Sequence, residues 1–535
     1  MGDYEKIMDI IREDVKYEDE LVELIIHVCL SAWSREPLNL FLKGPSAVGK
    51  SWIAKNVVKF FPQSNVWNLG GMSPKSLIHL PMTPIDEEGN PIQEPVRPLP
   101  RELKDPEKRA KYREELREYH EKLRNARWLI DLRHKILLFL EKPERDTFDI
   151  LRPILSHDAF EICFPFVDRK GKGPLRTMNV ILRGWPATIF CSEDVPWTEN
   201  LASRSLTASP KESKEKIKAS FEVSIRPYAD PFFILDSQRT LSEGREIVKK
   251  FIGMEEIKAL IPYEDALKES FPASSRRHMR DFKKFISLIE IHTALKPHPY
   301  VFIPILGTFN IATFEDLKEV EGFWWKIYES TWTGLAATTL ELFKIVKKLR
   351  DEGVDPTTVD IMKRYKDETG TFISQTTVRA YLDDLCNMGF LEKVTHPQDK
   401  RRNVYYPVEE KQQNSIISIF TVISRSFSQK DLENWFRKIL QNRECKITVC
   451  ISEGEKYEAE NGDNDAISKV AEKLYNTPFF SQYLTKQYSN SVLENNSEKT
   501  IKNENIENCC FSGEKILGEA PSGLHVRYVE NLTRK

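Results

Sequence analysis

The sequence has no apolar run that approaches the ~20 residues of a membrane-spanning helix, and its first residues, MGDYEKIMDIIRED, are acidic and amphipathic, unlike a secretory signal. It has no excess of charge. The net charge is −2, so any affinity for nucleic acid must come from local basic patches. It also lacks the cysteine spacing of a metal module, which indicates reduced thiols in a cytoplasmic protein. The eight cysteines are Cys29, Cys163, Cys191, Cys386, Cys445, Cys450, Cys509 and Cys510.

The most informative feature that is present is the segment GPSAVGKS at 44–51, which matches the phosphate-binding pattern GxxxxGK[ST]. An apolar run at 38–42 predicts a buried strand before it, and 51–55 predicts the start of a helix after it. In this context backbone N–H groups cradle the phosphates of ATP, the lysine reaches the β- and γ-phosphates, and the serine hydroxyl binds Mg²⁺. The predicted ATP-binding residues are Gly44, Pro45, Ser46, Ala47, Val48, Gly49, Lys50 and Ser51.

A phosphate loop needs an acidic partner on a neighbouring strand. The apolar segment 135–140 fits this role, because it predicts a strand that is followed directly by Glu141. Strands of this kind usually end in Asp-Glu, whereas here Leu140 precedes the single acid. We therefore predict Glu141 as a Mg²⁺ ligand, as the catalytic acid, or as both, with Asp131 and Glu144 as conceivable helpers.

Two alternating segments at 160–183 predict a β-hairpin whose turn is rich in glycine and carries Arg169, Lys170 and Lys172. A cationic turn is compatible with a solvated surface loop. In a translocating helicase such a turn would lie in a central pore and contact phosphates of a single DNA strand without base preference. We favour the DNA-binding interpretation because of the motifs around it.

Two further motifs follow the hairpin. Residues 187–191 predict a buried strand that ends in Ser192, whose hydroxyl is placed to orient water near the γ-phosphate. The segment NLASRS then places Arg204 just after this core. An arginine at such a position can serve the ATP of a neighbouring subunit as an arginine finger, and the alternative is an ordinary surface arginine.

The order of these motifs resembles that of AAA+ ATPases, and the inserted hairpin resembles the group that holds minichromosome maintenance helicases and the replicative helicases of plasmids and viruses. SPKSLIHL at 73–80 and the segment 311–345 look like the helicase part of primase–helicase fusions on mobile elements. The resemblance covers about 20–345. It implies a finger at Arg204 and a second sensor arginine at Arg280, with Arg277 as the alternate. The chain departs from this group in the single acid, in Ser192 where asparagine is usual, and in having no primase or zinc module.

A different pattern begins after the helicase-like part. Helices are predicted at 339–349, 357–365 and 375–388, the last with Ser374 as its N-cap, and a strand–turn–strand follows. This order resembles a winged helix-turn-helix, which would present its third helix to a DNA groove and its basic wing to phosphates. Use of the same fold for protein contacts is the alternative. The predicted DNA-binding residues here are Gln375, Thr376, Arg379, Lys400, Arg401 and Arg402.

The predicted fold class is α/β: an AAA+ P-loop core with an α-helical lid, a winged helix-turn-helix domain and a largely disordered tail. The expected function is an ATP-dependent DNA helicase or translocase for replication of a mobile element or virus, working as a homo-oligomeric ring, expected to be a hexamer. The alternative is an ATP-regulated DNA-binding switch without unwinding activity. The predicted regions are 1–37 (N-terminal helices), 38–209 (core, with an insertion at 84–127), 210–334 (lid and connector), 335–408 (winged helix) and 409–535 (one helix and a low-complexity tail).

Overall fold

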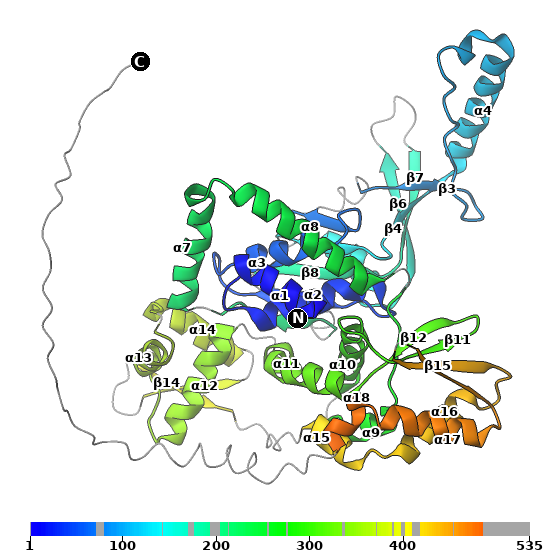
Figure 1. Cartoon of the computed structure of the whole chain (residues 1–535). Coiled ribbons are helices and arrows are strands. Elements are labelled where there is room, and N and C mark those ends of the chain that lie inside the picture. Colours follow the sequence, from blue (N-terminus) through cyan, green and yellow to red (C-terminus); the bar gives the residue numbers. More distant parts are fainter. Residues whose placement is uncertain are drawn as a thin grey trace, which may run out of the picture. The chain divides into compact units, whose positions relative to one another are not determined.

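The structure is a computed structural model, and its arrangement is shown in Figure 1. The structure describes residues 2–70, 80–141, 143–168, 176–192, 204–211, 213–253, 256–273, 277–333, 337–370, 372–387, 390–396, 402–408, 418–452 and 454–484. Within these ranges, no helix combines the length and the apolar character that crossing a membrane requires.

The centre of the nucleotide-binding core is a parallel five-stranded sheet in the order β2-β5-β8-β1-β9. The strand that leads into the phosphate loop therefore lies between the strand that ends in Ser192 and the last strand of the core. The predicted α/β fold class is confirmed. The strands are β1 (Asn39–Lys43), β2 (Val66–Leu69), β5 (Ile136–Phe139), β8 (Ala187–Ser192) and β9 (Leu206–Ala208).

Both faces of this sheet are covered, which is why its strands are nearly continuous apolar runs. Alternate residues point to opposite faces. Leu40 and Leu42 join the core that is built with the helices α1 (Asp3–Asp14), α2 (Asp19–Leu30) and α3 (Lys50–Val58). Phe41 between them joins a separate core with α5 (Arg145–Leu155) on the other face. The sheet is thus covered by helices on one face and by α5 with the strand residues Ile130, Val180 and Leu182 on the other, and the ends of its strands are left for the site.

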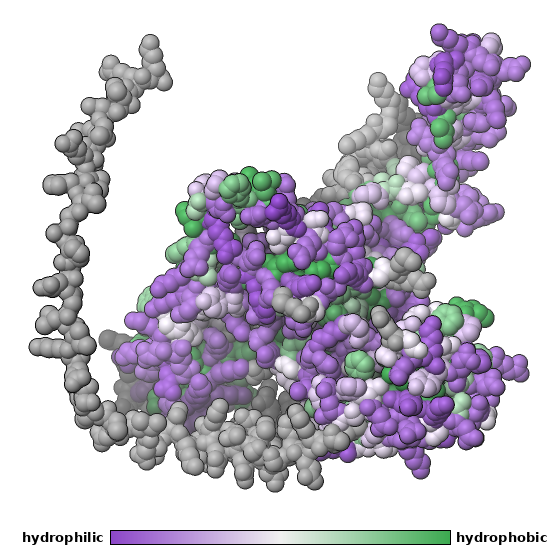
Figure 2. Space-filling view, viewed as in Figure 1, coloured by the Kyte–Doolittle hydropathy of each residue, from purple (hydrophilic) through white to green (hydrophobic). Residues whose placement is uncertain are grey.

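The predicted insertion and hairpin form a second, four-stranded sheet in the order β3-β4-β7-β6. Strands β6 (Glu161–Asp168) and β7 (Arg176–Arg183) pair antiparallel along their whole length, and β4 (Arg127–Asp131) pairs parallel to β7. Between β3 (Thr83–Ile85) and β4 the chain forms α4 (Pro106–Asn125), a charged helix with no buried residue. Figure 2 shows its hydrophilic surface.

The chain after 409 differs from the prediction of one helix followed by a low-complexity tail. Residues 418–484 fold into α15 (Ile419–Ser426), α16 (Gln429–Leu440), β15 (Lys446–Ser452), β16 (Glu455–Glu460), α17 (Asn464–Tyr475) and α18 (Pro478–Leu484). The two strands complete a sheet in the order β10-β12-β11-β15-β16, whose other members are β10 (Ala259–Leu260), β11 (Tyr300–Ile303) and β12 (Gly307–Ile311). The chain therefore returns to the lid after the winged helix. Residues 485–535 lie outside the described residues.

The lid itself is helical, as expected, and shares its hydrophobic core with α2, α3 and residues 418–484. Glu321 of the lid is buried, and its carboxylate caps the first turn of α15. It accepts hydrogen bonds from the backbone N–H groups of Ile419 and Phe420, each at 2.8 Å. A negative charge at a helix N-terminus is favourable, so this contact attaches the returning chain to the lid. The lid helices are α7 (Lys214–Ala229), α8 (Phe233–Ile252), α9 (Glu264–Ser270), α10 (His278–His292) and α11 (Phe314–Thr333).

The predicted winged helix-turn-helix is present. It comprises α12 (Ala337–Asp351), α13 (Thr358–Thr369), α14 (Gln375–Asn387), β13 (Leu391–Thr395) and β14 (Asn403–Pro407). Val378, Leu382 and Leu385 of α14 are buried in a core of its own. The Ser374 hydroxyl accepts a hydrogen bond from the backbone N–H of Thr377 at 3.1 Å, so it caps α14 as predicted. The two strands pair antiparallel.

Candidate functional site

The phosphate loop lies between β1 and α3, at the carboxyl edge of the parallel sheet, where ligands of such sheets bind. Its backbone adopts left-handed angles at Ala47 (φ +66°) and Gly49 (φ +96°), and Gly44 has φ +149°. These angles turn successive N–H groups into a concave surface that suits an anion. A Cβ atom at Gly44 would come within 3.2 Å of Val48, so glycine keeps the cradle open. The loop fits the triphosphate of a nucleotide.

Lys50 begins α3, and its ammonium group donates hydrogen bonds to the carbonyl oxygens of Gly44 at 2.6 Å and Pro45 at 2.7 Å. The lysine is therefore held across its own loop, ready to exchange these carbonyls for phosphate oxygens. Ser51 follows it and lies beside Cys191 of β8. Burial raises the pKa of that thiol, while Ser51 and Lys50 oppose the shift. These contacts bring the first turn of α3 next to the end of β8.

A second lysine contacts the phosphate loop from the lid. The Lys216 ammonium on α7 donates to the Val48 carbonyl at 3.1 Å and to the Glu18 carboxylate at 2.5 Å. Glu18 lies between α1 and α2 and is almost fully buried, and burial raises its pKa despite the lysine. Its carboxylate also accepts from the backbone N–H of Lys211 at 2.8 Å. Because 198 residues separate the two charges, no local pattern in the sequence indicates this contact.

The polar strand ends line up at the same edge of the sheet. Phe41, Phe190 and Phe139 stack across three strands with ring centroids 4.7 Å apart. Two residues further along, Lys43 of β1 pairs in register with Ser192 of β8. Glu141 lies two residues beyond Phe139, which is the partner of Phe190 in the register of β5 and β8. Glu141 and Ser192 therefore follow neighbouring strands at the same level, and Glu141 is exposed.

Arg204 lies at the opposite edge of the sheet. It precedes β9, whose Leu206 pairs with Leu40 in parallel register. Extended by two residues, this register places Arg204 level with Leu38, which lies six positions before Gly44 of the phosphate loop. At ~3.3 Å per residue, these six positions span about 20 Å. An arginine side chain does not cover this distance, so Arg204 cannot contact a nucleotide in the loop of its own subunit.

Arg204 is held instead by the turn that follows α5. Its guanidinium donates to the Ser156 carbonyl and pairs with Asp158, both at 2.7 Å. The hydrogen bond from Arg204 is the main cause that lowers the pKa of Asp158, and Arg280 of α10 adds a smaller electrostatic contribution. Asp158 thus contacts the predicted finger directly, while the predicted second sensor affects it only through its charge. Asp158 was not predicted, because no motif includes it.

The alternate sensor, Arg277, has a different environment. Its Nε lies 3.5 Å from the carboxylate of Asp281, which is fully buried and also pairs with Lys284 at 2.7 Å. Burial lowers the pKa of Lys284 to about 8. Lys284 also donates to the Ser205 carbonyl at 3.3 Å, next to the finger. Arg277 therefore belongs to an ion-pair group inside the lid, and Lys284 fixes the backbone beside Arg204.

The predicted DNA-contacting residues are placed only in part. Gln375, Thr376 and Arg379 are exposed at the start of α14, and Arg402 is exposed before β14. Their exposure is compatible with contacts to a DNA groove or to DNA phosphates. The remaining predicted cations, Arg169, Lys170, Lys172, Lys400 and Arg401, lie outside the described residues, as does most of the segment 73–80.

No family model matches the sequence, and no curated protein matches it. Among solved structures, the chain is similar to the Orc1 protein of Aeropyrum pernix in complex with DNA, at 12% identity and a TM-score of 0.20, covering 79% of this chain and 96% of that one. It is also similar to Cdc6p from Pyrobaculum aerophilum, at 13% identity and a TM-score of 0.17, covering 77% and 93%. Likenesses of this strength do not bear on function, which has to come from the site itself.

Proposed function

We propose that the protein is an ATP-dependent DNA helicase or translocase that acts in replication of a mobile element or virus and hydrolyses ATP between subunits. One observation carries the proposal. The phosphate cradle lies at one edge of the sheet, and Arg204 lies about 20 Å away at the other edge. A complete hydrolytic site then needs the cradle of one subunit and the arginine of the next, as in a ring.

The chain supplies each group that this chemistry needs. Backbone N–H groups of the loop bind the phosphates, and Lys50 leaves its loop carbonyls to contact them. The Ser51 hydroxyl and the Glu141 carboxylate are oxygen donors of the kind that Mg²⁺ prefers, and bound Mg²⁺ would neutralise phosphate charge. Ser192 orients the attacking water beside Glu141. Arg204 and Arg280 of the neighbouring subunit neutralise the charge of the transition state.

DNA would be contacted in two places. The winged helix presents exposed polar residues on α14, which fits a duplex groove. The hairpin built by β6 and β7 would carry Lys170 and Lys172 along a single strand. Movement of this hairpin with ATP turnover is what distinguishes a motor from a simple DNA-binding protein.

Mixing two inactive variants tests the shared site. Lys50→Ala removes the phosphate contact and Arg204→Ala removes the finger, so each alone should be inactive. In an equimolar mixture, about one interface in four pairs an intact loop with an intact arginine, so about a quarter of wild-type turnover should return. Mixtures as inactive as the single variants would contradict the shared site. An active Lys50→Ala protein would contradict the nucleotide site itself.

A second candidate is an ATP-regulated DNA-binding switch, in which nucleotide sets the oligomeric state and the winged helix does the main work. The observed winged helix favours it. ATP hydrolysis with and without single-stranded DNA separates the two, using wild type and Lys170→Ala/Lys172→Ala. DNA stimulation that is lost in the variant supports the motor. Equal, slow turnover in all four conditions, together with tight duplex binding, supports the switch.

A further inference from the structure

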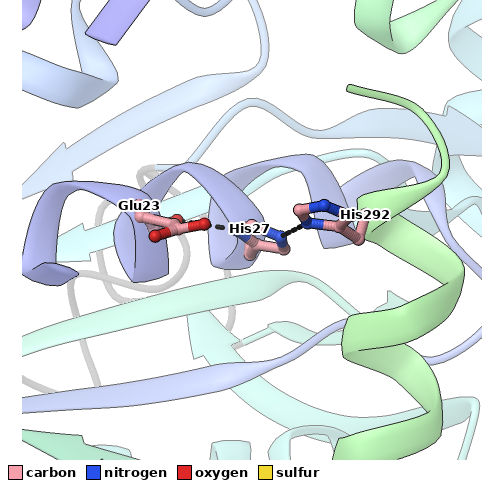
Figure 3. A group of neighbouring side chains, drawn as sticks. All are labelled: Glu23, His27 and His292. Atoms are coloured by element: carbon pink, nitrogen blue, oxygen red, sulfur yellow. Dashed lines mark hydrogen bonds between the residues drawn. The ribbon is translucent and has the colours of Figure 1, made fainter. Parts of the chain in front are cut away.

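Two fully buried histidines meet where the core joins the lid. His27 of α2 and His292 of α10 face each other through Nε2 and Nδ1, which are 3.0 Å apart. Their rings are nearly parallel, and their centroids are 5.2 Å apart. Glu23 lies one helical turn before His27, and Figure 3 shows the three residues in a row between the two helices. One ligand atom from each lies within 4.8 Å of the others.

The outer nitrogen of each ring already has an acceptor. His27 Nδ1 is 2.8 Å from the backbone carbonyl of Glu23, which can only accept, so this nitrogen carries a proton. His292 Nε2 is 2.9 Å from the Glu319 carboxylate and donates to it. In two neutral imidazoles the facing nitrogens then both carry lone pairs. Lone pairs at this distance repel unless a positive species is held by both.

The carboxylates around the rings favour a cation. Glu315 and Glu319 pair with the same lysine, Lys296, at 3.0 and 2.7 Å, and are about a third exposed. Glu23 is half-buried, and the nearby Lys326 is paired with a different carboxylate. One lysine therefore faces two carboxylates beside the buried rings, and a cation held by both rings and Glu23 would complement this negative charge.

We propose that Glu23, His27 and His292 bind one divalent transition-metal ion, with Zn²⁺ as the best match for two imidazoles and a carboxylate. The outer contacts are those typical of zinc-bound histidines, which donate their second N–H to a carboxylate or a backbone carbonyl. Tyr4 donates a hydrogen bond to Glu23 and would fix the third ligand in the same way.

The distance between the rings fits such a site. Two imidazoles bound to one tetrahedral zinc at ~2.1 Å have centroids roughly 5.3 Å apart and nitrogens about 3.4 Å apart. The observed centroid distance of 5.2 Å already matches, while the nitrogens at 3.0 Å must separate by a few tenths of an ångström. The rings point end to end, so each must also turn by roughly 35° to direct its lone pair at a shared ion. The ion would join α2 to α10, which carries Arg280 at its other end.

The test uses the full chain, stripped with a chelator and titrated with Zn²⁺, and with Co²⁺ as a spectroscopic probe. Wild type should bind one ion in this site, show the visible absorption of tetrahedral Co²⁺, and unfold at a higher temperature with metal. His292→Gln and Glu23→Gln should each weaken binding more than tenfold. His298→Gln is the matched control, because the His298 side chain is also buried on the lid, pairs with Asp316 at 2.8 Å and belongs to no group of candidate metal ligands among the described residues.

Each outcome decides the proposal. Loss of the ion and of the thermal shift in His292→Gln and Glu23→Gln, with both kept in His298→Gln, supports the site. If His292→Gln does not fold, Glu23→Gln leaves both rings in place and still decides. Equal metal binding by all three variants would place the ion elsewhere and overturn the proposal. A wild-type protein whose stability responds to pH but not to metal would show a shared proton between the rings, and would overturn it as well.

Discussion

Lys216→Met is expected to destabilise the protein and to loosen the phosphate loop. The ammonium lies 2.5 Å from the Glu18 carboxylate, and the two side chains are 17% and 2% exposed. Breaking a buried ion pair by removing one partner costs about 3–5 kcal/mol, because the remaining charge is left without compensation. The variant also removes a hydrogen bond to the Val48 carbonyl.

The cost should depend on pH. Burial already raises the pKa of Glu18, and loss of the lysine raises it further. At low pH Glu18 is protonated in both the folded and the unfolded chain, so the variant loses only a neutral contact. The unfolded carboxyl is the same in both proteins, so the difference between them depends only on the pKa of Glu18 in the two folded states. The deficit grows as the pH rises above the pKa of Glu18 in the folded wild type, and it levels off above the higher pKa in the folded variant. A larger deficit is therefore expected at pH 8 than at pH 5.

The assay is chemical denaturation at pH 5 and pH 8, with two comparison variants. Lys249→Met removes the similarly short (2.6 Å) but exposed pair with Glu246, whose side chains are 62% and 63% exposed, and should change stability by less than ~0.5 kcal/mol. Glu18→Gln/Lys216→Met removes both charges and should recover much of the loss. The reasoning fails if Lys216→Met and Lys249→Met cost the same, or if the loss in Lys216→Met does not change with pH.

Three further changes test other parts of the proposal. Arg204→Ala should lower ATP turnover about 10³-fold or more with unchanged equilibrium binding of nucleotide. An equal loss of turnover and of nucleotide binding would exclude a finger. Glu141→Gln should keep ATP bound without turnover, and rapid single-turnover hydrolysis would remove Glu141 from catalysis. Arg379→Ala should weaken duplex binding by ~1–3 kcal/mol if it reads a base, whereas Arg364→Ala, on the neighbouring helix α13 and paired with Glu352 and Glu368, should not.

The nucleotide cradle could be predicted from the sequence because its geometry is local. A strand, eight loop residues and a helix start define it, and the structure has β1, left-handed angles at Ala47 and Gly49, and α3 in that order. The winged helix was predictable for the same reason, since Ser374 caps the helix whose start it marks. Motifs whose parts are neighbours in the chain can be read without the fold.

The features that were not predicted depend on contacts between distant segments. Strand β15 has seven residues that largely alternate apolar and polar side chains, so its own sequence favours a strand. Its place beside β11, about 150 residues earlier in the chain, has no local signal. Because the residues after 485 are mostly polar, the folded segment 418–484 before them was predicted as part of the same tail. Glu18 and His27 are an isolated acid and an isolated histidine in the sequence, and their charged or aromatic partners Lys216 and His292 lie far along the chain, on α7 and α10.

In the proposed ring, the contact between Arg204 and Asp158 would prepare the finger in a subunit that does not use it. An unpaired arginine next to a subunit interface would adopt many conformations, and ordering it would oppose catalysis. Asp158 fixes it at 2.7 Å, yet this carboxylate is 60% exposed, and pairs of such exposure contribute only ~0–1 kcal/mol. Arg204 can therefore exchange the carboxylate for the phosphate of a neighbour at little cost. Orientation is gained without an ion pair strong enough to retain the arginine.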